Sequence, residues 1–158
     1  MSTMTALRTV ALRPPLHHMV ALAAAWSCGD APERFTEPIV LGGQQVSPEV
    51  LAKGARTYAL YCVGCHAADG SGRSDRNRSR PVPPRDFSAA EFRYVSGPEG
   101  SLPTDEDLDA TVRRGIPDNG MPAWAGLPED DRHAVIQYLK TFSPRWRTEI
   151  PAAPKEAS

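Results

Sequence analysis

A one-sided apolar pattern predicts a helix directly upstream of two closely spaced cysteines. Its apolar and small positions recur three and four residues apart: Val50, Leu51, Gly54, Tyr58 and Tyr61. That spacing places them on one face of an α-helix. The stretch Ser-Pro-Glu at residues 47–49 supplies an N-cap, a proline at the first helical position and an acid in the first turn. We therefore expect a helix that begins at residue 48 and leads into the segment "YCVGCH".

Two later segments also have helical patterns. Residues 104–107, Thr-Asp-Glu-Asp, resemble a capping box with Asp in the position usually held by Glu. They predict a short helix that ends at Gly115, a suitable C-cap residue. A final helix is predicted to begin at residues 128–131, and its apolar stripe comprises Val135, Ile136, Tyr138, Leu139 and Phe142. No segment alternates apolar and polar residues over a useful strand length, so the predicted class is all-α.

These patterns divide the chain into four parts. Residues 1–27 precede an isolated cysteine. Residues 28–46 contain two prolines and a Gly-Gly pair without clear periodicity, which predicts a linker. Residues 47–143 contain all the predicted helices and form the predicted domain. Residues 144–158 are rich in proline and alanine and predict a flexible tail.

The first part has the order of an export signal. Two arginines without any acid are followed by the apolar residues 19–26 and then by Ser27 and Cys28. Cys28 resembles the bacterial lipobox cysteine, which is lipidated after cleavage and becomes the mature N-terminus. The match is imperfect, because Trp26 is bulky for its position and Ala25 stands where leucine is usual. Cleavage after Ala25 without lipidation is the alternative. Either route predicts a periplasmic protein, and lipidation of Cys28 would anchor it to a membrane.

Composition and charge narrow the possible partners. The formal net charge of −1 gives no indication of a nucleic-acid partner, and we expect none. No run of about 18 apolar residues is present, so we expect no membrane-spanning helix in the mature chain. The chain has three cysteines, of which two belong to one short motif. Any function must therefore explain that pair.

The motif Cys-x-x-Cys-His at residues 62–66 has three chemical interpretations. A thioredoxin-like redox dithiol requires a βαβ setting, which this sequence lacks. A zinc site requires four ligands, and beyond the motif the candidates are His133 and scattered acids. Haem accounts for every residue: two thiols three positions apart on a helical turn face one porphyrin edge, and the following histidine reaches the iron. The motif is therefore interpreted as a site of covalent haem attachment.

The order of the segments extends this interpretation to a family. A helix, Cys-x-x-Cys-His, a proline-rich loop, a Met-Pro loop and a closing helix follow one another in residues 47–143. In this order the chain resembles class I cytochrome c in its small bacterial monohaem form. The resemblance implies a cytochrome c-like fold of three to five helices wrapped around one haem c. This haem would be bound covalently through Cys62 and Cys65, with His66 as an iron ligand.

The resemblance also implies the second iron ligand and the partner of the first. Met121, in "NGMPAW", is the candidate sixth ligand, because the other methionines lie in the predicted signal segment. The ring nitrogen of His66 that does not bind iron is expected to donate to a backbone carbonyl, which fixes the ring. In the family this is a proline carbonyl in the following loop. Pro83 and Pro84 are both candidates here.

Several other residues are candidates for haem or partner contacts. Arg85 and Trp124 suit haem propionates or the haem edge, although a solvated arginine and plain core packing are the alternatives. Four further arginines form either a partner-facing patch or an ordinary solvated loop: Arg73, Arg76, Arg78 and Arg80. Four residues resemble those at the family's crossed terminal helices, where glycine permits close approach: Gly54, Tyr58, Val135 and Tyr138.

The predicted function is one-electron transfer. Iron with two protein ligands has no open position for a substrate, so we expect a carrier between redox protein partners rather than an enzyme. Residues 86–108 further resemble monohaem cytochromes that serve larger respiratory or molybdenum oxidoreductases, and a dedicated haem subunit of such a complex is the alternative. A haem-based gas sensor is a second alternative, which requires that the sixth ligand leave easily.

Overall fold

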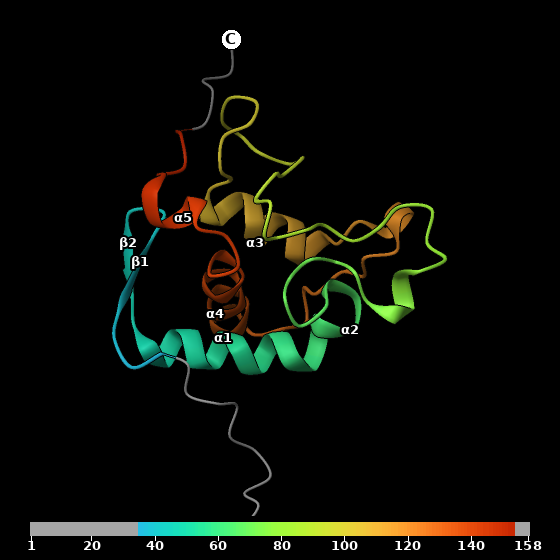
Figure 1. The fold of residues 1–158 in the computed structure, drawn as a ribbon, viewed down its shortest axis with the longest axis horizontal. Coiled ribbons are helices and arrows are strands. Elements are labelled where there is room, and N and C mark those ends of the chain that lie inside the picture. Colours follow the sequence, from blue (N-terminus) through green and yellow to red (C-terminus); the bar gives the residue numbers. More distant parts are fainter. Residues whose placement is uncertain (1–34, 154–158) are drawn as a thin grey trace, which may run out of the picture.

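The computed structural model describes residues 35–153, and the regular secondary structure of this part is mainly helical (Figure 1). Five α-helices follow in chain order: α1 Pro48–Tyr61, α2 Val63–His66, α3 Asp105–Arg114, α4 Glu129–Lys140 and α5 Arg145–Thr148. Two short 3-10 helices, η1 Asp75–Asn77 and η2 Pro117–Asn119, lie in the loops before and after α3. The helix count lies within the predicted range of three to five. The predicted export signal and Cys28 lie outside the described residues.

The crossing of α1 and α4 forms the centre of the fold. Figure 1 shows α4 nearly end-on where it crosses α1. At the crossing, a Cβ atom on Gly54 would lie 2.1 Å from the backbone oxygen of Ala134, so only glycine permits this approach. The Tyr58 and Tyr138 rings lie beside it, with their centroids 5.4 Å apart. The predicted crossing of these two helices is confirmed.

Local capping chemistry sets the helix ends as predicted. The side chain of Ser47 accepts a hydrogen bond from the backbone of Val50 at 3.4 Å, which caps α1. Thr104 and Asp107 form a reciprocal capping box at the start of α3, with both distances between 3.0 and 3.2 Å. Gly115 ends α3 with φ of +67°, a left-handed value that favours glycine.

A β-hairpin corrects two sequence predictions. Strands β1 Ile39–Leu41 and β2 Gln44–Val46 pair antiparallel in a region predicted to be a linker in an all-α protein. Gly42 and Gly43 make the two-residue turn, and both have positive φ, as a type I′ turn requires. Leu41 is fully buried and Val46 is 5% exposed, so residues 39–46 belong to the domain. Three-residue strands are too short to show alternation, although a Gly-Gly pair between short apolar runs is a hairpin signal.

The segment after α4 corrects the predicted flexible tail. Trp146, on α5, is 1% exposed and belongs to the hydrophobic core. Its backbone oxygen accepts a hydrogen bond of 2.6 Å from the amide of Gly42, which joins α5 to the hairpin. Burial of a tryptophan side chain stabilises this segment enough to order it. The tail prediction is therefore wrong for residues 145–148, whereas residues 154–158 lie outside the described part.

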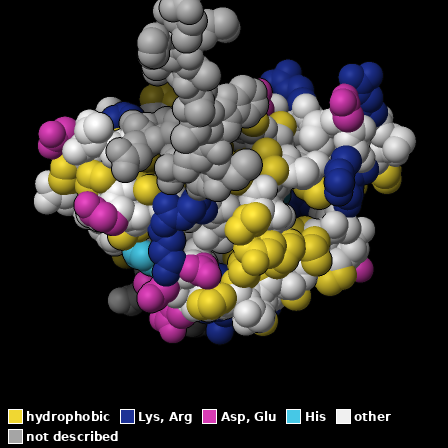
Figure 2. Space-filling view, turned by 90° about the horizontal axis from the view of Figure 1, so that it is seen from below, with side chains coloured by type: hydrophobic (Ala, Val, Ile, Leu, Met, Phe, Trp, Pro, Cys, Tyr) yellow, Lys and Arg dark blue, Asp and Glu magenta, His cyan; other side chains and the backbone are white. Residues whose placement is uncertain are grey.

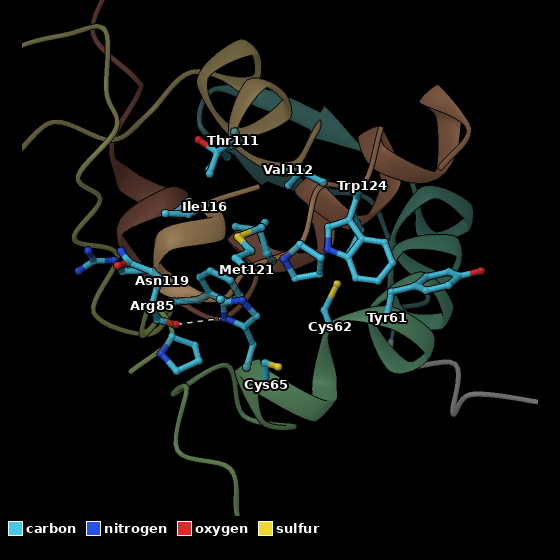
Figure 3. Close-up of a pocket in the computed structure, with 18 of the residues that line it drawn as sticks. Tyr61, Cys62, Cys65, Arg85, Thr111, Val112, Ile116, Asn119, Met121 and Trp124 are labelled. Carbon is cyan, nitrogen blue, oxygen red and sulfur yellow. Dashed lines mark hydrogen bonds between the residues drawn. The ribbon is translucent and has the colours of Figure 1, made fainter. Parts of the chain in front are cut away.

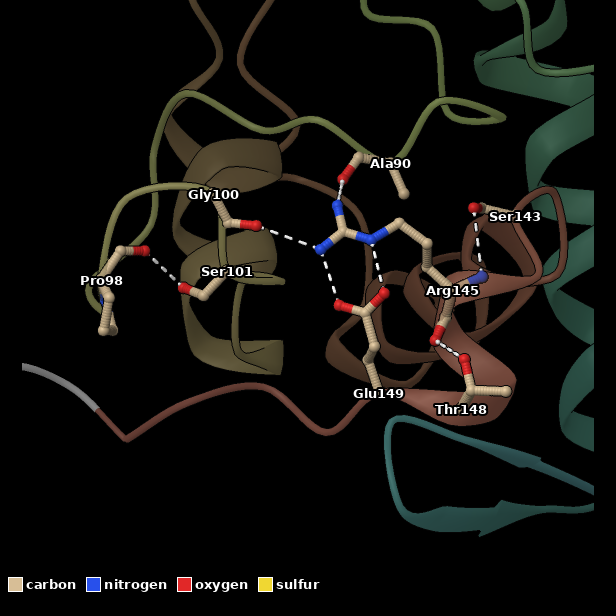
Figure 4. Close-up of polar contacts among 8 residues, drawn as sticks. All are labelled: Ala90, Pro98, Gly100, Ser101, Ser143, Arg145, Thr148 and Glu149. Atoms are coloured by element: carbon tan, nitrogen blue, oxygen red, sulfur yellow. Dashed lines mark hydrogen bonds and ion pairs between the residues drawn. The ribbon is translucent and has the colours of Figure 1, made fainter.

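Arg145, on α5, holds the long loop that precedes α3 (Figure 4). Its guanidinium donates to the backbone oxygens of Ala90 at 2.8 Å and Gly100 at 3.0 Å. Both carboxylate oxygens of Glu149 accept from the same guanidinium at 2.7 Å. One planar group with several donors thus connects two points of the loop to α5.

A buried ion pair joins α3 to α4. Lys140 is 1% exposed, and its ammonium contacts the carboxylate of Asp105 and the side-chain oxygen of Gln137. Gln137 also donates to Asp105 at 2.6 Å.

Among the described residues, no helix has the length and apolar character needed to cross a membrane.

Candidate functional site

The predicted haem residues line one pocket. It lies between α2, the proline-rich loop, α3, the Met121 loop and α4, and most of its walls are hydrophobic. Figure 3 shows the side chains of Cys62, Met121 and Trp124 around the same cavity. All seven predicted haem-binding residues are among those that line it: Cys62, Cys65, His66, Pro83, Arg85, Met121 and Trp124.

The cysteine motif forms a single helical turn. The backbone amides of Cys65 and His66 both donate to the oxygen of Cys62, at 3.1 and 2.9 Å. Burial, followed by the nearby Cys65, raises the pKa of the Cys62 thiol to about 11. A redox dithiol requires a lowered thiol pKa, so this environment does not favour the dithiol interpretation. No group of three or more His, Cys, Asp or Glu side chains within residues 35–153 is arranged to hold a metal ion.

His66 is fixed in orientation by two contacts. Its Nδ1 lies 3.3 Å from the backbone oxygen of Arg85, and because a carbonyl can only accept, Nδ1 carries the hydrogen. The ring stacks on Phe87 with centroids 4.4 Å apart and an interplanar angle of 14°. Burial lowers the pKa of His66 despite the opposing carbonyl contact. The neutral ring therefore has Nε2 free to bind a metal.

The carbonyl that contacts His66 corrects a prediction. The sequence predicted Pro83 or Pro84, whereas the structure has Arg85. Gly72 brings the two parts of this loop together, because a Cβ atom there would lie 2.5 Å from the oxygen of Pro84. Its φ of +71° is also a value that favours glycine. Both prolines line the pocket beside the contact.

Met121 lies on a short closed loop. It pairs with Ile116 through two backbone hydrogen bonds, of 2.9 and 3.1 Å. The amide of Gly120 donates to Pro117 at 2.8 Å within the same loop. The amide of Trp124 donates to the oxygen of Val112 at 3.0 Å, which connects the loop to α3. These bonds hold the methionine side chain at the pocket wall.

The two residues with alternative roles differ in their surroundings. The Trp124 ring packs against Tyr61, with centroids 5.3 Å apart, and both side chains line the pocket. Arg85 is exposed, and its backbone rather than its side chain makes the recorded contact with His66. The propionate roles of Arg85 and Trp124 remain predictions.

Phe87 and Asn77 contribute to the site but were missed in the sequence, and Arg80 was considered only for a partner-facing patch. Phe87 stacks on His66, and Asn77 donates to the backbone oxygens of Cys65 and Gly72. Arg80 lines the pocket and donates to the oxygen of Asn119 at 2.7 Å. No local motif marks these residues, because each acts through a contact with a distant segment.

The predicted arginine patch is partly neutralised. Arg78 pairs with Asp75 at 2.8 Å, and Arg73 lies 3.7 Å from a carboxylate oxygen of Asp86. The side chains of these arginines are more than 80% exposed, so the pairs contribute little to stability. The patch remains a weak candidate for partner recognition.

The donor set of this pocket fits a haem. Two thiols one helical turn apart, an imidazole with a free Nε2 and a thioether line a pocket with hydrophobic walls. Fold and site together define a c-type cytochrome domain.

Residues 49–139 match the family described as cytochrome c oxidase, cbb3-type, subunit III. The chain belongs to this family, and a cytochrome c domain of this kind implies that it binds haem.

A solved structure is similar in fold and sequence. The chain is 35% identical to a chain of the reducing HAO-like protein complex of Kuenenia stuttgartiensis, with a TM-score of 0.64. The match covers 66% of the present chain and 47% of the other one, so it spans about half of that protein.

Proposed function

We propose that the chain is a one-electron carrier with one haem c, attached through Cys62 and Cys65 and ligated by His66 and Met121. The observation that carries this proposal is that all four side chains line one pocket, with His66 oriented by Arg85 and Phe87. When bound, the haem supplies an iron centre that accepts and releases one electron. The residues of the protein bind the haem and hold its two ligands in place.

The protein holds the two side chains that would ligate the iron on separate supports. His66 is held by the carbonyl of Arg85, and Met121 by its backbone pairing with Ile116. Such supports would keep the two side chains in similar positions in both oxidation states, which favours fast electron transfer. If His66 and Met121 both bind the iron, no position would be open to a substrate, so we propose a carrier rather than an enzyme. Methionine ligation raises the reduction potential.

The end of α1, beside the pocket, supplies the surface for a redox partner. Leu60 and Tyr61, at the end of α1, are 74% and 45% exposed, and Tyr61 also lines the pocket. Figure 2 shows hydrophobic side chains gathered on part of the face viewed from the α1 side. Without residues 1–27 the chain has 16 basic and 19 acidic residues, a formal net charge of −3. This modest charge and the apolar surface favour a partner that docks through hydrophobic contacts.

Two spectroscopic measurements test the carrier. Haem should remain with the polypeptide after acid-acetone extraction and give a pyridine haemochrome typical of two thioethers. Haem that is extracted by this treatment would refute covalent attachment. The ferric protein should have the weak near-infrared band of sulfur–iron ligation, and Met121→Ala should abolish it and lower the reduction potential. An unchanged band in that variant would mean that another residue is the ligand.

A dedicated subunit of a larger oxidoreductase is the second candidate. The matching family is described as an oxidase subunit, and the similar structure is part of a protein complex. Size-exclusion chromatography of gently solubilised native membranes distinguishes the two candidates. A carrier elutes near its own mass, whereas a subunit co-elutes in fixed ratio with other redox proteins. Carbon monoxide that readily binds the reduced protein would instead favour a gas sensor.

We also propose that the protein is periplasmic and anchored by lipid at Cys28. The periplasmic location rests on the export-type sequence of residues 1–27. The anchor rests on the lipobox-like Cys28, because two acyl chains suffice for stable membrane attachment. The protein should then sediment with membranes and be released by detergent but not by high salt. Cys28→Ala should abolish membrane attachment and leave the haem spectrum intact. An intact mass that begins at Trp26 without lipid would refute the anchor and leave the haem assignment untouched.

A further inference from the structure

One hydrogen bond crosses from the His66 side of the pocket to the Met121 loop. Arg80 follows η1 in the arginine-rich loop, and its Nη2 donates to the backbone oxygen of Asn119 at 2.7 Å. Among the hydrogen bonds of the described residues, this one alone connects segment 67–94 to segment 115–124. Arg80 is half-buried and lines the haem pocket.

Gly120 is shaped to receive this guanidinium. A Cβ atom on Gly120 would lie 1.9 Å from Nη2 of Arg80, so the arginine packs directly over the glycine backbone. The φ of Gly120 is +72°, a left-handed value. The residue directly before Met121 therefore has both the conformation and the empty space that the Arg80 contact requires.

The other bonds of the Met121 loop serve a different purpose. The pairing of Met121 with Ile116 closes the loop on itself, and the Trp124 amide connects it to α3. Neither bond reaches the wall that carries His66. A movement of the whole loop away from that wall would leave the pairing of Met121 with Ile116 intact but would stretch or break the contact between Arg80 and Asn119.

Arg80 also differs from its neighbours in the same loop. Arg73 and Arg78 are paired with carboxylates and are highly exposed. The contact that the described structure gives the Arg80 side chain is with a backbone oxygen, and a charged donor makes such a bond stronger than a neutral one.

We propose that Arg80 is a positioning residue, which latches the Met121 loop to the His66 side of the pocket and thereby keeps Met121 bound as the sixth ligand. The proposal rests on the proposed haem ligation. Its measurable consequence concerns added ligands, which bind the iron only when Met121 has left. Their apparent affinity therefore rises with the population in which the loop is open.

The test is an imidazole titration of the ferric holoprotein at constant pH, followed by visible absorption. Arg80→Met removes the donors but retains an unbranched stem that reaches as far as Nε, and it should raise imidazole affinity roughly 10- to 150-fold, as expected for loss of a charge-assisted hydrogen bond. Arg80→Lys retains a charged donor group, and its imidazole affinity should lie between those of Arg80→Met and the wild type. Arg78→Met, an exposed arginine of the same loop, is the matched control and should match the wild type.

Gly120→Ala provides a second, independent test, because its methyl group displaces the guanidinium. It should raise imidazole affinity in the wild-type background by more than in the Arg80→Met background, where no guanidinium remains to be displaced. This coupling separates loss of the latch from the strain of a positive φ, which both backgrounds share. Equal effects in the two backgrounds would overturn the proposal.

The outcomes also separate this inference from the haem assignment. If the wild type has the near-infrared band and Arg80→Met binds imidazole as weakly as Arg78→Met, the latch is refuted while the ligation stands. A melting temperature that falls without any change in imidazole affinity also refutes it, because a merely structural role would do the same. If Met121→Ala leaves the band unchanged, both the ligation and the latch are refuted.

Discussion

Replacement of Gly54 by alanine tests the helix crossing on which the site is built. The added Cβ atom would lie 2.1 Å from the oxygen of Ala134 and 2.7 Å from the Cβ atom of Tyr138. Because ordinary contacts begin at 3.4 Å, the helices must separate by about 1 Å, and the backbone oxygen cannot rotate away as a side chain would. We expect a strain of about 3 kcal/mol, offset by about 1 kcal/mol from the better helix propensity of alanine.

The net loss of about 2 kcal/mol should lower the melting temperature by about 8 °C. The assay is thermal unfolding of the haem-loaded protein, followed by the far-ultraviolet helical signal. Gly126→Ala is the matched control, because nothing lies within 4 Å of its added Cβ atom. It should shift the melting temperature by no more than about 2 °C. If Gly54→Ala melts together with this control, the argument from close helix approach is wrong.

Three further predictions concern the supports of the site. Thr104→Ala should cost about 1 kcal/mol in chemical unfolding, whereas Thr104→Ser should retain the cap; equal midpoints would contradict it. Arg145→Gln should increase hydrogen exchange in residues 88–101 but not in α1, since the contacts to the loop and Glu149 are lost; unchanged exchange in that loop would refute this role. Burial raises the pKa of Asp107, but the hydrogen bonds that its carboxylate accepts outweigh burial, so its pKa lies below its ordinary value. The stability that the ionised carboxylate contributes is therefore lost as the pH falls through this lowered pKa. Asp107→Asn should be less stable at neutral pH and should lose less stability on acidification; parallel pH profiles would contradict this.

The parts of the fold that are encoded locally were predictable from the sequence. The Ser47 and Thr104 caps, the glycine end of α3 and the apolar stripe of α4 each depend on residues within a few positions of one another. The β-hairpin was missed because its strands have only three residues each. The order in α5 depends on burial of Trp146 against distant segments, which composition does not reveal.

The candidate site likewise has residues that can be recognised from local sequence and supports that cannot. Cys62, Cys65 and His66 are recognisable because their chemistry requires a fixed local spacing, and Met121 because it lies in a Met-Pro loop downstream. The contacts that hold these side chains in place cannot be recognised in this way. The acceptor for His66 is a backbone oxygen, and every residue offers one, so the sequence could not distinguish Arg85 from Pro83.

The same reasoning explains why Arg80 stands out only in the folded protein. In the sequence it is one of several arginines in a polar loop, and its acceptor is a carbonyl 39 positions away. The informative local feature was the glycine before Met121, which alone among residue types leaves room for a guanidinium there. The candidate ligand Met121 can thus be recognised from its own side chain. How firmly its loop is held depends instead on the space above Gly120 and on the backbone oxygen of Asn119. Substitutions of Arg80 and Gly120 should therefore alter the hold on Met121 while every recognisable motif residue remains in place.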